Sequence, residues 1–193
     1  QTVPTDNKGN TYTLRGGRIV TDGIATTIGT YYTIWSGSGA ITVRCNYASG
    51  SNEDIQMIAV SGADTTTIFD PWPSFSSPWT SAVSTLNGNE FIFFVWSNDG
   101  GATGSLTCSS DFSLVNPMTV NSNRGGECTE VVTTTLSNRV VWGQYSVNGN
   151  NLIEVDAIMQ ATTTVSQPVV CNMVNSAPSI AITLKAGTTV VGA

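Results

Sequence analysis

The sequence predicts an all-β fold in which antiparallel strands form a two-sheet sandwich related to the jelly roll. Short segments rich in β-branched and aromatic residues recur about ten residues apart, and turns rich in Gly, Asn and Pro separate them. No stretch shows the apolar periodicity of a helix longer than about two turns. Short strands joined by tight turns favour two antiparallel sheets packed face to face. A closed barrel is the alternative.

The segment from Asn89 to Trp96 is the strongest strand candidate. After Glu90 it is entirely apolar, and Asn, Gly and Ser residues border it on both sides. A continuous apolar run of this length predicts a strand that is covered on both faces. We therefore expect this strand at the centre of the molecule, with a layer above it and a layer below it.

The first half of the chain begins with a polar segment, residues 1–10, which we expect to form an N-terminal arm. The strand candidates after it are 11–14, 18–21, 24–27, 30–35, 40–47 and 55–60. Asp22-Gly23 predicts a hairpin, and the Ser-Gly-Ser-Gly run at 36–39 predicts a second one. Residues 61–80 contain three prolines, so we expect a long ordered loop there rather than a central strand.

The second half offers the strand candidates 82–86, 90–96, 104–109, 111–120, 130–136, 139–147, 151–160, 161–170 and 179–184. Asn87-Gly88 and Asn148–Asn150 predict two further hairpins. In the C-terminal strand and tail, 179–193, Ile180, Ile182 and Leu184 alternate with polar neighbours. Such a strand completes either its own sheet or the sheet of a neighbouring copy by strand addition.

The composition predicts one secreted β-sandwich domain that spans residues 1–193. Only 10% of the residues are charged, so uncharged polar side chains cover the surface, as in secreted or assembled proteins. The net charge of −6 argues against a nucleic-acid partner. No apolar run approaches the roughly 18 residues of a membrane-spanning helix. The chain opens on Gln1, as a mature chain does after removal of a signal peptide, and we expect an extracellular or cell-surface location.

The chain contains four cysteines, Cys45, Cys108, Cys128 and Cys171. They are widely spaced, they include no Cys-x-x-Cys pair, and the chain has no histidine, so two disulfides are favoured over a zinc site. Disulfides indicate an oxidising compartment. We favour pairing Cys45 with Cys108 and Cys128 with Cys171, although the other two connectivities stay open.

The absence of histidine also limits the catalysis that the chain can perform. It excludes Ser-His-Asp and Cys-His mechanisms and His-ligated metal centres. Glycoside hydrolysis needs only two carboxyl groups, and Glu90, Glu154 and Asp156 are the candidates. Glu154 and Asp156 are two residues apart and share a face if their strand is regular. The alternative is that all three acids are solvated residues of an outer face.

The sequence offers two candidate binding sites besides the carboxylates. We expect no cofactor unless calcium binds in the polar loops that contain Asp54 and Asp99, whose carboxylates are the candidate ligands. The alternative is an ordinary Asx turn at both places. The candidates for a sugar-stacking platform are Trp72, Trp79, Tyr31 and Tyr32. The alternative is that these aromatic side chains fill one end of the core.

Together these features predict a non-enzymatic, secreted structural subunit. We expect it to assemble with copies of itself into an extracellular filament, an appendage or a virion surface through β-strand contacts, with Ile180, Ile182 and Leu184 in the contact strand. The alternative is a carbohydrate-binding module, lectin or adhesin that binds glycans through exposed aromatic residues. A secreted polysaccharide-active enzyme is the third hypothesis.

Overall fold

The computed structural model describes residues 2–22, 24–46, 54–70, 74–76, 80–99, 107–115, 118–120, 123–144, 150–161, 167–174 and 180–184. These residues form antiparallel β-strands, which confirms the predicted all-β class. The strands are β1 (Thr5–Asp6), β2 (Thr13–Asp22), β3 (Ile24–Trp35), β4 (Ile41–Cys45), β5 (Asp54–Ala59), β6 (Ser74–Ser76), β7 (Thr80–Val83), β8 (Glu90–Asp99), β9 (Thr107–Cys108), β10 (Ser113–Leu114), β11 (Met118–Val120), β12 (Asn123–Val132), β13 (Arg139–Gln144), β14 (Asn150–Met159), β15 (Gln167–Val174) and β16 (Ile180–Leu184).

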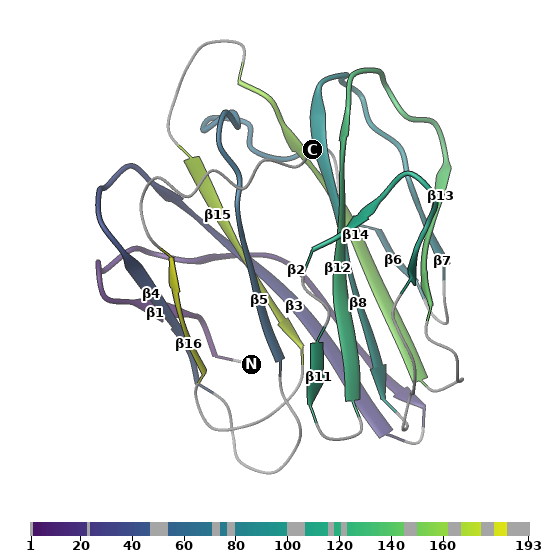
Figure 1. The fold of residues 1–193 in the computed structure, drawn as a ribbon, viewed down its shortest axis with the longest axis horizontal. Helices are drawn as coiled ribbons and strands as arrows, with labels where there is room; N and C mark the ends of the chain where they lie inside the picture. Colours follow the sequence, from purple (N-terminus) through teal and green to yellow (C-terminus); the bar gives the residue numbers. More distant parts are fainter. Residues whose placement is uncertain are drawn as a thin grey trace.

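The strands are divided among several sheets, and none of these sheets closes into a barrel. A six-stranded sheet has the order β10-β12-β8-β14-β6, with β11 also paired to β12. A four-stranded sheet has the order β2-β3-β15-β5, and two three-stranded sheets have the orders β1-β4-β16 and β7-β13-β9. In Figure 1 the sheets follow one another across the molecule, from β4 and β16 on one side to β7 and β13 on the other.

Three hydrophobic clusters lie between successive sheets and define the layers. The first cluster joins Val83 and Val141 of the β7-β13-β9 sheet to one face of the six-stranded sheet. The second cluster joins the other face of that sheet to Ile28 and Ile58 of the four-stranded sheet. The third cluster lies between the four-stranded sheet and the β1-β4-β16 sheet, and Val43 is one of its members. The two larger sheets are therefore covered on both faces.

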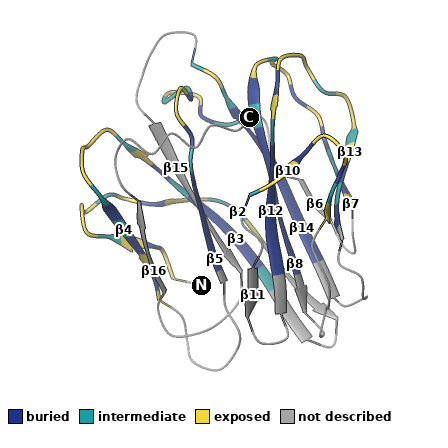
Figure 2. Cartoon of the chain, in the orientation of Figure 1, coloured by how far each residue is buried: buried dark blue, intermediate teal, exposed yellow. Residues whose placement is uncertain are grey.

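Strand β8 lies where the sequence predicts the most buried strand. Its residues from Ile92 to Trp96 are all 0% exposed, and the strand is paired with β12 on one side and β14 on the other. Phe94 and Trp96 point into the first cluster, whereas Phe93 and Val95 point into the second. Figure 2 shows this block of buried strands between more exposed margins. The prediction of a central strand with layers on both sides is confirmed.

One of the four predicted hairpins is confirmed, and three are wrong. Strands β2 and β3 pair up to Asp22 and Ile24, on either side of the predicted turn. The segments around 36–39, around Asn87-Gly88 and around Asn148–Asn150 were expected to connect paired strands. Instead β3 and β4, β7 and β8, and β13 and β14 belong to different sheets. At these places the chain passes from one layer to the next, because each strand also has an apolar face to bury against a second sheet.

Candidate functional site

Strand β14 brings two of the three predicted carboxylates together. Glu154 lies opposite Val95 of β8, and Asp156 lies opposite Phe93. Both β8 residues belong to the second hydrophobic cluster, so the two acids share the face that packs on the four-stranded sheet. The prediction that they share a face is confirmed. The alternative of a solvated outer face is wrong for both, since Glu154 is 0% exposed and Asp156 is 2% exposed.

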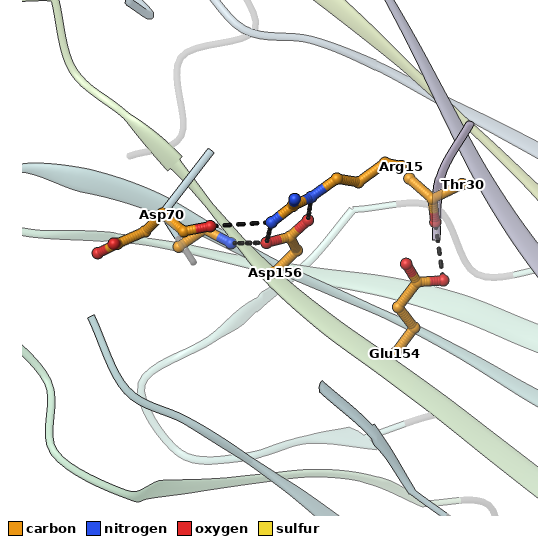
Figure 3. Close-up of polar contacts among 6 residues, drawn as sticks. Arg15, Thr30, Asp70, Glu154 and Asp156 are labelled. Carbon is orange, nitrogen blue, oxygen red and sulfur yellow. Dashed lines mark hydrogen bonds and ion pairs between the residues drawn. The ribbon is translucent and has the colours of Figure 1, made fainter. Parts of the chain in front are cut away.

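Arg15 of β2 supplies the positive charge for this interior. Its Nε lies 2.6 Å from Oδ2 of Asp156, and its Nη2 lies 3.0 Å from Oδ1, so the guanidinium binds the carboxylate with two hydrogen bonds. Nη2 also donates to the backbone oxygen of Asp70 at 2.9 Å, and the guanidinium carbon lies 4.4 Å from the centre of the Phe69 ring. Figure 3 shows the guanidinium of Arg15 between Asp156 and the backbone oxygen of Asp70.

The environment of Asp156 contains groups that raise its pKa and groups that lower it. Burial raises the pKa of Asp156. The two hydrogen bonds and the charge of Arg15, together with the backbone N–H of Ala157, oppose that rise because they favour the ionised carboxylate. The pKa of Asp156 is still raised overall, so the ion pair with Arg15 offsets only part of the free-energy cost of burying this carboxyl group.

Glu154 is held by one hydroxyl group from the opposite sheet. Thr30 of β3 donates from Oγ1 to Oε2 of Glu154 at 2.8 Å, whereas Oε1 is buried and accepts no hydrogen bond from a described residue (Figure 3). The pKa of Glu154 is raised to about 8, chiefly by burial; the hydrogen bond from Thr30 and the charge of Arg15 lower it, and the charge of Asp156 raises it. At neutral pH Glu154 is therefore mostly protonated.

Glu90, the third predicted carboxylate, lies at the start of β8 and is 2% exposed. The pKa of Glu90 is raised to about 8, chiefly by burial and then by the neighbouring Asp70, whereas a hydrogen bond with Thr85 lowers it. Asp70 is itself buried, and its Oδ2 accepts hydrogen bonds from the backbone N–H groups of Leu86 at 2.5 Å and Asn87 at 3.3 Å. The expectation of a solvated residue is thus wrong for Glu90 as well.

This network joins two sheets in the interior of the protein. Arg15 and Thr30 come from the four-stranded sheet, while Glu154 and Asp156 come from the six-stranded sheet. A glycoside hydrolase needs both carboxyl groups in contact with a sugar. Glu154 and Asp156 have almost no exposed surface, and Asp156 is bound by Arg15. In this arrangement the acids connect one sheet to the other through Arg15 and Thr30.

Sequence reasoning missed Arg15, Thr30 and Asp70. Arg15 is one of only seven basic residues in the chain, and its position directly after the predicted strand 11–14 is the one signal in the sequence. Nothing in the spacing of Arg15 and Asp156 predicts their contact, because they are brought together by the stacking of sheets that the sequence pattern does not specify.

The aromatic residues of the predicted sugar platform are distributed differently. Trp72 and Trp79 lie outside the described residues. Tyr31 is 5% exposed and packs in the third cluster, whereas Tyr32 packs on the second cluster and makes an edge-to-face contact with Phe69 at 4.9 Å. Tyr31 and Tyr32 therefore point to opposite faces of β3, and they do not form a shared platform.

The two calcium candidates lie at strand ends in different sheets. Asp54 is the first residue of β5, and Asp99 is the last residue of β8, with side chains outside the described part. Among the described residues, no group of three or more His, Cys, Asp or Glu side chains is arranged to hold a metal ion.

The structure changes the predicted disulfide pairing. Cys108 of β9 is bonded to Cys128 of β12, so the pairing of Cys45 with Cys108 and of Cys128 with Cys171 is wrong. The bond joins the β7-β13-β9 sheet to the six-stranded sheet, a link between layers that sequence separation does not reveal. Cys45 is fully buried in β4, and Cys171 lies in β15 with its side chain outside the described part.

The predicted contact strand is β16, which contains Ile180, Ile182 and Leu184. It pairs with β4 of the same chain, with Ile180 opposite Cys45 and Leu184 opposite Ile41. The strand therefore completes a sheet of its own chain, and a role in assembly stays a prediction.

Comparison with known proteins adds no relative: no family model, no curated protein and no solved structure matches this chain. In the part of the chain that the structure describes, no helix has the length and apolar character needed to cross a membrane.

Proposed function

We propose that this chain is a non-enzymatic structural subunit that is secreted and assembles with copies of itself into an extracellular structure. The observation that carries the proposal is the position of the carboxylates. Glu154 and Asp156 lie between two sheets, where Arg15 and Thr30 bind them. Acids in this position connect two layers, and their burial weighs against the rival hypothesis of a polysaccharide-active enzyme.

The proposed scaffold is a β-sandwich built on the six-stranded and four-stranded sheets. The second hydrophobic cluster and the Arg15–Asp156 pair lie between them. A smaller sheet packs on the outer face of each, and the Cys108–Cys128 disulfide fastens one of these smaller sheets. Sheets that are joined by a disulfide and that carry few charges are typical of a protein that works outside the cell.

Edge strands are the proposed route of assembly. An open sheet leaves backbone N–H and C=O groups unpaired along its edges, and a strand of another copy can pair with them. Strand β2 ends the four-stranded sheet, has ten residues without proline, and carries Leu14 with 55% of its surface exposed. Strand β16 ends the β1-β4-β16 sheet and provides a second edge, where Ile180, Ile182 and Leu184 keep their proposed role.

A lysine at an edge strand tests this proposal, because a charged side chain opposes pairing with another strand. We expect Leu14→Lys to lower the fraction of assembled protein at least tenfold, measured by sedimentation velocity and negative-stain microscopy at matched concentration. Leu86→Lys is the control, since Leu86 is 75% exposed and lies between β7 and β8, outside both strands.

The proposal fails if the wild-type protein stays monomeric at millimolar concentration. If instead both lysine variants reduce assembly equally, the contact does not involve the β2 edge, and the proposed route is wrong.

A further inference from the structure

The register of the four-stranded sheet bears on the two cysteines outside the Cys108–Cys128 bond. Cys171 of β15 lies directly opposite Tyr31 of β3 and directly opposite Met57 of β5. Residues that face one another across an antiparallel ladder occupy the same face of the sheet. Cys171 therefore has the same face position as Tyr31 and Met57.

That face packs on the sheet that contains Cys45. Tyr31 and Met57 belong to the third hydrophobic cluster, together with Ile41, Val43 and Cys45 of β4. Cys45 thus belongs to the same hydrophobic cluster as the two residues that flank Cys171 in the sheet.

The neighbours of Cys171 along β15 support the same assignment. Val170 lies opposite Ile58, which packs in the second cluster, on the other face of the sheet. Because successive residues of a strand alternate between faces, Cys171 belongs to the face opposite Val170. With Cys108 and Cys128 bonded to each other, Cys45 and Cys171 are the two cysteines that remain.

We propose that Cys45 and Cys171 form a second disulfide, which joins the β1-β4-β16 sheet to the four-stranded sheet. The oxidant is a small-molecule or protein disulfide. The thiolate of one cysteine attacks it and releases one thiol, and the second cysteine then attacks the mixed disulfide and releases the other. The two cysteines lose two protons and two electrons, and the oxidant is reduced to two thiols. This inference does not rest on the proposed function, because it concerns only the linkage between layers.

Peptide mapping of the intact chain tests the proposal. The protein is folded in a glutathione redox buffer, treated with N-ethylmaleimide in denaturant, and digested with trypsin and a glutamyl endopeptidase. Cleavage after Arg, Lys and Glu places the four cysteines on four separate peptides, 45–53, 91–124, 128–130 and 155–185. We expect mass spectrometry to find 45–53 linked to 155–185, and 91–124 linked to 128–130.

Two results would overturn the proposal: alkylated Cys45 and Cys171 on unlinked peptides, or either cysteine linked to Cys108 or Cys128. Serine variants give an independent readout. If the bond exists, Cys45→Ser leaves one alkylated thiol at Cys171, and Cys171→Ser leaves one at Cys45. The double variant should then have the same denaturant midpoint as each single variant, because all three lack the same link, whereas additive losses would contradict the bond. If a variant fails to fold, the wild-type map still decides.

Discussion

Arg15 compensates the negative charge of Asp156 in the interior between the two large sheets. It is the partner of Asp156, which is 2% exposed, and its own side chain keeps 15% of its surface exposed. Buried ion pairs contribute little net stability compared with apolar residues of the same shape, because both charges lose their hydration. Removal of one partner is costly, since the remaining charge is then buried alone. This asymmetry determines how substitutions at the pair should behave.

We predict that Arg15→Met lowers the free energy of unfolding by about 3 to 5 kcal/mol at pH 7. Methionine retains much of the apolar stem but leaves the Asp156 carboxylate without its cation. Urea denaturation followed by tryptophan fluorescence measures the change. Arg44→Met is the matched control: Arg44 is exposed on β4, and its loss should change stability by less than about 0.5 kcal/mol.

A double-mutant cycle separates the ion pair from packing. In Arg15→Met/Asp156→Asn no carboxylate is left at position 156, so the double variant should be more stable than the sum of the two single losses predicts. Simple additivity would show that the pair does not couple the sheets.

At the scale of strands, the local sequence pattern predicts the positions of the strands better than it predicts which strands pair. The apolar run at 90–96 predicts β8 because continuous burial has a local signature. The turn at Asp22 forms the predicted hairpin, whereas Asn87-Gly88 connects strands of different sheets. Whether the two strands pair or stack depends on which distant strand is available, such as β12 and β14 for β8.

The same reasoning explains what was missed in the site. The pairing of Glu154 and Asp156 on one face follows from a period of two along a strand, and it could be predicted from the sequence. Their contacts with Arg15 and Thr30 cross between layers and span more than 100 residues of sequence. No local signal specifies such contacts.

Gly143 tests the packing of β13 on β8. A Cβ atom at this position would lie 3.2 Å from Cγ of Trp96 and 3.4 Å from Cε2 of Phe94. We predict that Gly143→Val destabilises the protein by about 1 to 3 kcal/mol, because the two rings would have to move in a tightly packed core. Thermal unfolding followed by near-UV circular dichroism measures this effect. Val140→Ala on the same strand is the control, since Val140 is 55% exposed; equal losses for the two variants would mean that this layer contact is loose.

For the whole molecule, the buried glutamates couple folding to pH. The pKa of Glu90 and that of Glu154 are both about 8 in the folded protein, compared with 4.5 for an ordinary glutamate. Between these values the folded protein binds more protons than the unfolded chain, so stability decreases as pH rises from about 4.5 to about 8. Asp6 has the opposite effect. Its pKa is lowered in the folded protein, so the stability that its ionised carboxylate contributes is lost as pH falls through acidic values. Stability should therefore be greatest in mildly acidic solution.

We predict that the melting temperature falls between pH 5 and pH 8.5, and that Glu154→Gln reduces this dependence. Glutamine resembles the protonated glutamate and can still accept the hydrogen bond from Thr30. Since a tenfold change in a proton equilibrium corresponds to about 1.4 kcal/mol, the variant should gain on the order of 3 kcal/mol relative to wild type across this range. Differential scanning calorimetry at constant ionic strength measures the curves. Asp111→Asn, which removes one negative charge at an exposed position, controls for net charge. A Glu154→Gln curve parallel to that of the wild type would show that Glu154 does not take up a proton on folding, and the acids between the sheets would then have to be stabilised as ions.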